Sequence, residues 1–184
     1  MNIFYLDKDP AVSASMHLDK HVVKMCTEYA QLLSTAHRLL DGELYIGRTK
    51  NNHKIKRWKL HDERENNLYK AGHVNHPSAV WARVSRSNYY YLYFLYMATL
   101  AEYSYRYGKI HGASKPSLWL QRAPYNLCDK KGLTEMPQCM PEYCKVPGNP
   151  IKAYHTYYIH EKKSFATWKG KVNGRKQPEW YIFS

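Results

Sequence analysis

The sequence lacks the features of membrane, secreted and metal-binding proteins. No uninterrupted apolar run approaches the ~20 residues that a membrane-spanning helix needs, and the start, MNIFYLDKDP, has neither the basic end nor the apolar stretch of a secretory signal. The four cysteines form no CxxC pair and have no histidine at a recognised zinc spacing. We therefore expect a soluble, cytoplasmic protein with no membrane contact, no disulfide, no metal site and no cofactor.

Acidic residues and phenylalanine are both scarce. The chain has only 15 Asp and Glu but 28 Lys and Arg, which gives a net charge of +13 over 184 residues. This excess indicates a polyanionic partner, which we expect to be duplex DNA bound by a monomer. Four Phe stand against 18 Tyr. A Tyr ring can stack on a base and its hydroxyl can reach a phosphate, although tyrosines can also replace phenylalanines in a half-hydrated core.

Sustained strand alternation and internal repeats are also absent, and helix signals dominate the first part of the chain. A helix is expected over residues 9–40, because Asp9-Pro10 suits a helix start and Asp41-Gly42 a stop. Residues 43–72 are charged and polar. Within them, residues 54–70 suit a short amphipathic helix that follows an exposed basic loop, a stretch that is either solvated surface or a phosphate contact.

The second half of the chain contains the clearest helix. Residues 73–109 include a start signal at His76-Pro77-Ser78, a long Tyr-rich apolar stretch, and a stop at Gly108. Residues 110–148 are rich in proline and have little periodicity, so we expect a long ordered loop. A third helix is expected from Asn149-Pro150 to Gly170. The fold class predicted is all-α, a compact bundle of three main helices joined by long ordered loops.

One face of the first helix carries a line of polar residues. At about 100° per residue, the side chains on this line are those of His17, His21, Lys24, Glu28, Gln31 and Thr35. A polar line of this kind can be a solvated surface with no further role. This line, however, has few long solubilising side chains and borders the apolar face, which favours a binding or catalytic role. The i, i+4 spacing of His17 and His21 would suit zinc, but Leu-Asp-Lys between them lacks a general-base glutamate and places a cation beside the site. An anion-binding or acid–base site fits better.

The residues suggest how such a site would divide its roles. Glu28 would transfer a proton, while His21 and Lys24 would hold a phosphate or stabilise negative charge. The histidines and backbone N–H groups of the turn before the long helix would bind a second phosphate. His73 and His76 can equally serve in capping and loop packing.

The order of these segments resembles a known family. The first helix contains HLDKHVVKMCTEYAQLL, the turn HVNHPSAVW leads into a Tyr-rich helix that ends YRYGK, and the tail contains PEWYIF. This pattern resembles the phage pyrimidine dimer DNA glycosylases of the T4 endonuclease V type. The resemblance implies an all-α fold of three helices packed side by side. It also implies an enzyme that extrudes a base, breaks the glycosidic bond through a Schiff base on an N-terminal amine, and cleaves the strand at the abasic site.

The resemblance also suggests roles for particular residues. Glu28 matches a glutamate near the family's active site, while Gln31 occupies the place of the catalytic glutamate. The family's amine belongs to a threonine exposed by removal of the initiator Met, whereas Asn2 is too large for ordinary Met removal. The amine would therefore be that of Met1, or a lysine amine activated by neighbouring cations.

These considerations give two sets of candidate residues. The candidate catalytic residues are Met1, Lys20, His21, Lys24, Glu28 and Gln31. The candidate nucleic-acid-binding residues are His17, His73, Asn75, His76, Ser78, Arg83, Arg86, Trp180 and Tyr181.

We expect a single domain spanning residues 1–184. The expected function is a DNA glycosylase, with AP-lyase activity, acting on a damaged or modified pyrimidine in duplex DNA. One alternative is a phage enzyme that transfers a group onto a DNA base in the same pocket. Another is a non-catalytic nucleotide-binding, nucleic-acid-binding or inhibitor protein.

Overall fold

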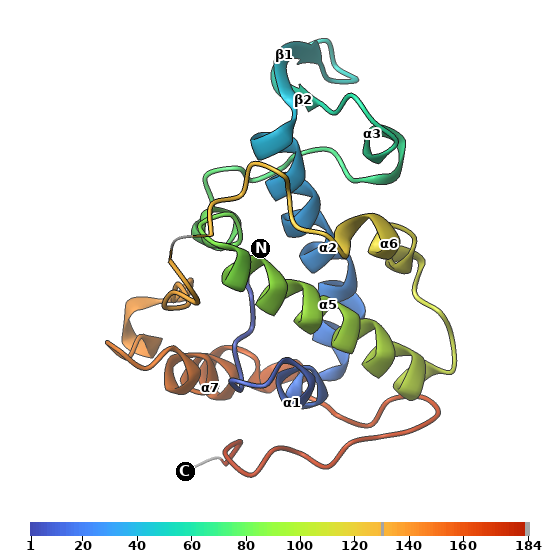
Figure 1. The fold of residues 1–184 in the computed structure, drawn as a ribbon. Coiled ribbons are helices and arrows are strands. Elements are labelled where there is room, and N and C mark those ends of the chain that lie inside the picture. Colours follow the sequence, from blue (N-terminus) through green and yellow to red (C-terminus); the bar gives the residue numbers. More distant parts are fainter. Residues whose placement is uncertain (130, 183–184) are drawn as a thin grey trace.

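Two long helices cross at the centre of the molecule. The computed structural model describes residues 1–129 and 131–182, and in it α5 (Arg86–Tyr107) crosses α2 (Asp19–Asp41) (Figure 1). At the crossing, α2 buries a continuous apolar face that includes Val22, Met25 and Leu33, and α5 buries Leu92 and Leu95. The core of the protein lies between these two helices.

Shorter elements surround this pair. The remaining helices are α1 (Pro10–Met16), α3 (Arg64–Asn67), α4 (Pro77–Trp81), α6 (Ser117–Leu120) and α7 (Pro150–Glu161), with single 3₁₀ turns at Gly112–Ser114, Glu142–Cys144 and Lys163–Phe165. Two antiparallel strands, β1 (Glu43–Arg48) and β2 (Lys54–Lys59), project from the end of α2 (Figure 1). The protein is therefore mostly helical. No helix in the described part of the chain is both long enough and apolar enough to cross a lipid bilayer.

The predicted first helix begins where expected but is interrupted. Asp9 caps α1 by accepting hydrogen bonds from the backbone N–H groups of Ala11 and Val12, and Pro10 is its first residue. The chain then turns extended at His17 and Leu18 before α2 begins. Partners from elsewhere in the chain use the carbonyl groups freed by this break, since Trp168 Nε1 donates to the carbonyl of Met16.

The helix predicted over residues 54–70 is wrong, and so is the expectation of no strands. Residues 43–59 form a hairpin in which Leu44 lies opposite Trp58 and Arg48 lies opposite Lys54. Asn52, in the turn, has a φ of 62°, a left-handed conformation that asparagine adopts more readily than most residues. Only residues 64–67 of the predicted helix are helical.

The predicted 73–109 helix is two helices. Pro77 is the first residue of α4 and Gly108 ends α5 in a left-handed conformation, as predicted. Between them the chain leaves the helix near Ala82, and Ser85 starts α5 by accepting a hydrogen bond from the backbone N–H of Asn88. A serine N-cap inside an apolar stretch therefore divides the element.

The third predicted helix starts correctly but ends early. The Asn149 side chain caps α7 and Pro150 is its first residue, yet α7 stops at Glu161 rather than near Gly170. Residues 167–175 instead return along the ends of α1, α2 and α5. Residues 110–148 form the expected ordered loop with short helical turns, apart from residue 130, which lies outside the described residues.

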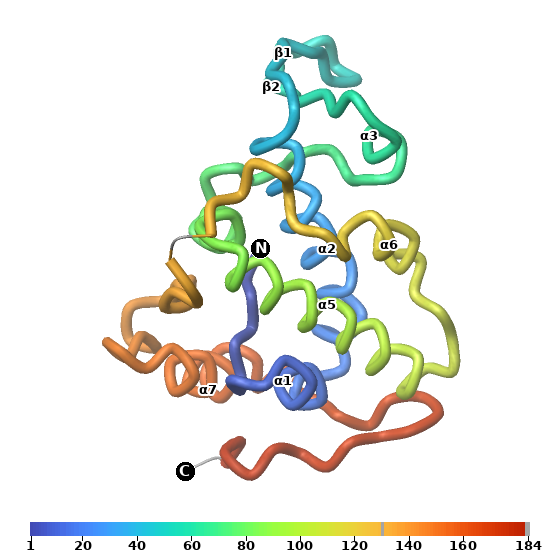
Figure 2. Tube along the Cα trace, in the orientation of Figure 1, coloured from blue at the N-terminus to red at the C-terminus, as the bar shows by residue number. Residues whose placement is uncertain are grey.

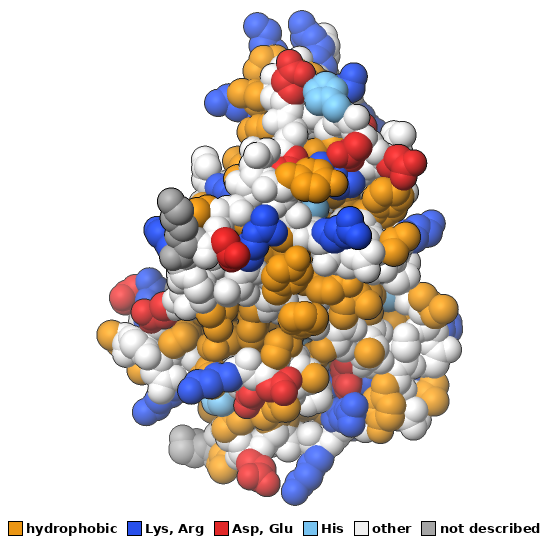
Figure 3. Space-filling view, viewed as in Figure 1, with side chains coloured by type: hydrophobic (Ala, Val, Ile, Leu, Met, Phe, Trp, Pro, Cys, Tyr) orange, Lys and Arg blue, Asp and Glu red, His pale blue; other side chains and the backbone are white. Residues whose placement is uncertain are grey.

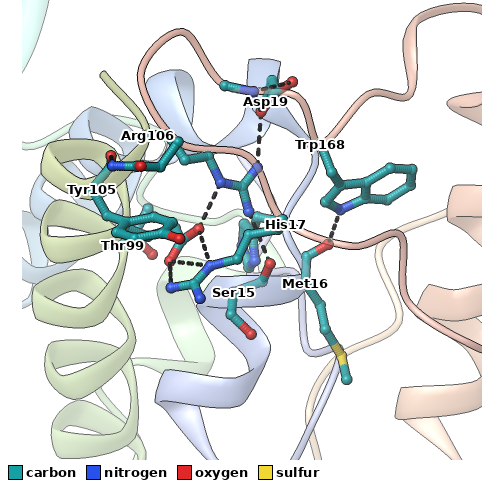
Figure 4. A network of polar contacts seen from close by, with 12 residues as sticks. Ser15, Met16, His17, Asp19, Thr99, Tyr105, Arg106 and Trp168 are labelled. Carbon is teal, nitrogen blue, oxygen red and sulfur yellow. Dashed lines mark hydrogen bonds and ion pairs between the residues drawn. The ribbon is translucent and has the colours of Figure 1, made fainter. Parts of the chain in front are cut away.

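A buried ion network ties this returning segment to the helices (Figure 4). Arg106, with no exposed surface, donates to the Glu102 carboxylate (2.6 Å), the Asp19 carboxylate (2.9 Å) and the Ser15 carbonyl (2.8 Å). Arg175 also donates to Glu102. We call these groups the Arg106 network. They join the α1–α2 break, the end of α5 and residues 167–175.

Candidate active site and nucleic-acid interface

The N-terminal segment divides the polar line of α2 into a buried part and an accessible part. Figure 2 shows the first residues descending from the N-terminus toward α1. Phe4 is buried and packs against His21 of α2 and against Tyr154 and Tyr158 of α7. His17 and His21 of the polar line are therefore covered, and Thr35 at its far end is buried as well. The accessible part consists of Lys24, Glu28 and Gln31.

His17 lies in the core, which corrects the prediction that it contacts nucleic acid. Its side chain has no exposed surface, its Nδ1 lies 2.6 Å from the Ser13 carbonyl, and its Nε2 lies 2.8 Å from the Tyr29 hydroxyl. Burial, and then the charge of Arg106, lower the pKa of His17 to about 4, partly opposed by the hydrogen bond to Ser13. A neutral, enclosed imidazole of this kind holds the α1–α2 break together and cannot reach a phosphate.

His21 is likewise structural, which corrects its assignment as a catalytic cation. Its ring stacks on Phe4 at 4.1 Å, and its Nδ1 lies 2.7 Å from the Tyr158 hydroxyl. Burial is the largest cause that lowers the pKa of His21, to about 2, and the nearby His17 and Lys162 act in the same direction. The ring is neutral near pH 7 and cannot supply positive charge to an anion.

The next turns of α2 carry the accessible part of the line. Lys24 Nζ lies 3.0 Å from Glu28 Oε1, with the lysine side chain 67% exposed and the glutamate side chain 15% exposed. Gln31 is half-buried and lies on the same face one turn beyond Glu28. The Glu28 carboxylate is thus partly enclosed, which strengthens its interactions with neighbouring charges.

The N-terminal amine and the turn before α4 complete this cluster. Burial lowers the pKa of His76, the positive charges of the Met1 amine and of His73 lower it further, and the Glu28 carboxylate raises it. These opposing effects place the amine, Glu28 and His73 within electrostatic range of His76. We call Met1, Lys24, Glu28, His73 and His76 the amine cluster.

Three local contacts hold the parts of the amine cluster in place. The Thr35 hydroxyl accepts a hydrogen bond from the backbone N–H of Gly72 at 3.2 Å, which fixes the turn to α2. Asn2 Nδ2 donates to the Cys139 carbonyl, and the Ser78 hydroxyl lies 3.6 Å from Cys139 Sγ. The chain start and the start of α4 are therefore fixed to the same cysteine.

The imidazole of His76 has a defined tautomer. Its Nδ1 accepts a hydrogen bond from the backbone N–H of Ser78, which makes it the cap of α4. A neutral ring in this arrangement carries its proton on Nε2. The alternative role expected for His76, helix capping, is therefore correct, and capping leaves Nε2–H available as a donor within the cluster.

The other candidate residues lie elsewhere or are occupied. Lys20 is exposed and sits over the Phe165 ring at 4.7 Å, about 12 Å along α2 from Glu28, so it is not part of the amine cluster. Ser78 is fully buried and Tyr181 is 1% exposed, which corrects their assignment as nucleic-acid contacts. Trp180 presents one ring face to His155 at 3.8 Å.

Three further candidates occupy the start of the α4–α5 region. Arg83 donates to the Ala79 carbonyl at 2.7 Å, and burial lowers its pKa. Arg86 lies 4.0 Å from Asp129. Asn75 is exposed in the turn beside His76. Arg83 and Arg86 are thus half-buried and engaged within the protein, while Asn75 is accessible.

The hairpin forms a cationic surface that the helix prediction concealed. Of residues 43–59, six are Lys or Arg and one, Glu43, is acidic, and Figure 3 shows cations gathered at this projecting end. Leu44, Ile46 and Arg48 alternate along β1 on one face and pair with Trp58, Lys56 and Lys54. None of the six cations has a carboxylate within 4.0 Å among the described residues.

Comparisons with known proteins add no family assignment. No protein-family model, curated protein or solved structure matches this chain. Residues 1–129 and 131–182 also contain no group of three or more His, Cys, Asp or Glu side chains placed to hold a metal ion. The features of this molecule that bear on function are therefore the amine cluster and the distribution of charge.

Proposed function

We propose that the protein is a DNA glycosylase with AP-lyase activity that acts on a damaged or modified pyrimidine in duplex DNA. The observation that carries this proposal is the amine cluster, in which a primary amine, a partly enclosed carboxylate and two imidazoles lie together at the surface. We also propose that the helical body is a divergent form of the T4 endonuclease V arrangement, to which the hairpin is an addition.

The amine cluster contains the groups that such a reaction needs. The Met1 amine, in its unprotonated form, would bond to C1′ of the sugar while the C1′–N bond breaks and the base leaves with the bonding electron pair. Glu28 would accept the proton that the amine gives up, and the leaving base would take a proton from water. Opening of the sugar ring then gives the Schiff base from which the strand is cleaved. Lys24 is the second amine within reach of Glu28.

The charge distribution supports duplex DNA as the substrate. Backbone phosphates supply much of the affinity of a DNA-binding protein, and lysines and arginines without a carboxylate partner are the groups that bind them. The hairpin offers six such cations on a two-stranded ribbon, a shape that the major groove admits. Phosphate contacts at the hairpin would offset the few kcal/mol that extruding a base costs.

The deciding experiment is borohydride trapping on defined oligonucleotide duplexes. The full-length protein is incubated with duplexes that contain an abasic site, a pyrimidine dimer or a hydroxymethylated pyrimidine. Borohydride reduces a Schiff base to a stable bond, so we expect a covalent protein–DNA adduct. Peptide mapping by mass spectrometry then locates the bond, which we expect on the Met1 amine rather than on the Lys24 side chain.

Matched variants connect the adduct to the cluster. Glu28→Gln should slow adduct formation about 100-fold, within the range of lost acid–base catalysis, whereas Glu135→Gln, the same substitution at an exposed glutamate outside both proposed sites, should leave it unchanged. Absence of an adduct on every duplex would contradict the amine mechanism. A mass gain of the DNA without an adduct would indicate group transfer, and DNA binding insensitive to Glu28→Gln without any reaction would indicate a binding protein.

A further inference from the structure

A hollow lies between α3 and the segment that follows α6, on the side of α2 opposite the amine cluster. Its volume is about 480 Å³, which lies within the usual range for a small-molecule site. The residues that define it are His37, Asp62, Arg64, Trp119, Arg122 and Tyr125. We call it the Arg64 pocket.

The floor of the Arg64 pocket is a fixed arginine. Arg64 Nη1 donates to Asp41 Oδ2 at 2.6 Å and to His37 Nδ1 at 2.9 Å, and its Nη2 donates to Asp62 Oδ2 at 2.7 Å. Two carboxylates and an imidazole therefore hold the guanidinium in one orientation. A planar cation fixed in this way is preorganised, because its side chain does not have to be ordered when a ligand binds.

A chain of hydrogen bonds behind the arginine makes this floor rigid. Because His37 Nδ1 accepts from Arg64, the ring proton lies on Nε2, which is 2.8 Å from the Tyr89 hydroxyl. That hydroxyl donates to the Leu120 carbonyl at 2.8 Å. Burial, followed by the charge of Arg64, lowers the pKa of His37 to about 4, so the imidazole stays neutral near pH 7.

The rim of the pocket is aromatic and open. The Tyr125 ring lies over the Arg64 guanidinium at 4.7 Å and is 72% exposed. Trp119 lines the same hollow and is half-buried, and among the described residues the rings of Trp119 and Tyr125 make no ring contact with each other. Arg122 is exposed at the edge and has no carboxylate within 4.0 Å in the described part of the chain.

We propose that the Arg64 pocket binds a nucleotide, with the base against the rings of Trp119 and Tyr125 and the phosphate at Arg122. Aromatic faces accept any base, a guanidinium matches a phosphate, and the outer edge of the Asp62 carboxylate can accept N–H or O–H groups of the base or sugar. Base and phosphate together suit a hollow of about 480 Å³ better than a base alone.

The Arg64 pocket is separate from the amine cluster. His37 follows Glu28 by nine residues, which places the two side chains on opposite sides of α2 and about 14 Å apart along its axis. The proposal therefore does not depend on the proposed function. The same chemistry would bind a free mononucleotide or one nucleotide of a single strand, and the experiment has an arm for each.

The test is isothermal titration of the full-length protein with each of the four deoxynucleoside 5′-monophosphates, with thymidine, and with a dT8 oligonucleotide. We expect saturable binding of at least one monophosphate or of dT8. Tyr125→Ala should weaken it at least about fivefold, the effect of losing one stacking partner. Arg122→Ala should weaken binding of the monophosphate about tenfold and leave binding of thymidine unchanged.

A matched variant separates the pocket from general effects. Tyr143→Ala removes a tyrosine of similar exposure, 65%, from a distant 3₁₀ turn and should leave the affinity unchanged. Binding of monophosphates sensitive to Tyr125→Ala supports a free nucleotide as ligand, and binding of dT8 alone with that sensitivity supports a nucleotide within a strand. No saturable binding of either ligand, or equal losses in Tyr125→Ala and Tyr143→Ala, would overturn the proposal.

Discussion

The Arg106 network and the hairpin lie in different parts of the molecule and use cations in opposite ways. At the Arg106 network, the guanidinium is fully buried between Glu102 and Asp19, and each charge has a partner. On the hairpin, six cations have no carboxylate partner among the described residues, and all of them except the half-buried Arg57 are exposed. Net charge alone does not reveal this difference. The buried arginine stabilises the fold, whereas the hairpin cations leave their charge available to a polyanion.

The largest effect should come from breaking the Arg106 network. Arg106→Met would leave Asp19 without a charged partner and Glu102 with Arg175 alone, and we expect the free energy of unfolding to fall by about 3–5 kcal/mol. Urea denaturation followed by circular dichroism measures this change. Arg48→Met, the same substitution on the hairpin, should change stability by less than about 0.5 kcal/mol. A loss below about 1 kcal/mol for Arg106→Met would remove the distinction between the two regions.

A smaller effect should come from acid, acting through the buried histidines. In the folded protein the pKa values of His17 and His37 are about 4, below the unfolded value near 6.5. Above pH 6.5 neither state binds the proton. Below pH 6.5 each of these imidazoles binds a proton in the unfolded chain but not in the folded chain. The free energy of unfolding therefore falls until the pH reaches the folded pKa. At pH 5 the loss is roughly 2 kcal/mol for each histidine.

Urea midpoints at pH 7 and pH 5 measure this loss. Replacing one of the two histidines, as in His17→Gln, should make the decline between these pH values shallower, whatever its effect at pH 7. The exposed His53 of the hairpin provides the comparison, because His53→Gln should leave the decline as it is in the wild type. An equal decline in all three proteins would show that the acid sensitivity arises elsewhere.

The smallest effect on stability, and the largest on DNA binding, should come from the hairpin. A triple variant, Arg48→Ala, Lys54→Ala and Lys56→Ala, should unfold within about 0.5 kcal/mol of the wild type. Each cation that binds a phosphate in the wild type should, when replaced, reduce the slope of log K against log salt by about 0.9 on duplex DNA. Fluorescence anisotropy over a series of salt concentrations measures that slope.

A control with the same reduction of charge tests whether position matters. Alanine at Lys8, Lys109 and Lys152 removes three exposed cations that lie outside the hairpin. We expect the slope to change less than in the hairpin variant. Equal changes in the two triple variants would indicate that DNA responds to the net charge rather than to the hairpin.

Local signals in the sequence correctly identified several helix ends. Asp9-Pro10 and Asn149-Pro150 start helices, and Gly108 ends one, because caps depend on neighbouring residues only. The division of α4 from α5 also had a local sign, the Ser85 cap. The break at His17 had none, because it is held by Arg106 and Trp168, which are distant in sequence.

The hairpin and the polar line of α2 show two different reasons for error. In residues 54–59, exposed and half-buried side chains alternate over only six positions that include many lysines. A helical pattern therefore competed with the correct strand pattern. On α2, spacing placed His21 and Glu28 on one side of the helix, which is correct. Whether that side is exposed depends on Phe4 and Tyr158, which cover His21 and leave Glu28 accessible. No periodicity within α2 contains that information.

The returning segment, residues 167–175, also determines when the protein can finish folding as it is made. Asp19 accepts hydrogen bonds from Thr167, Lys169 and Gly170, about 150 positions later in the chain. During synthesis these residues leave the ribosome about 150 positions after Asp19, so the Asp19 carboxylate is incompletely paired until they emerge. Chaperone binding to the nascent chain should therefore persist until residues 167–175 have emerged.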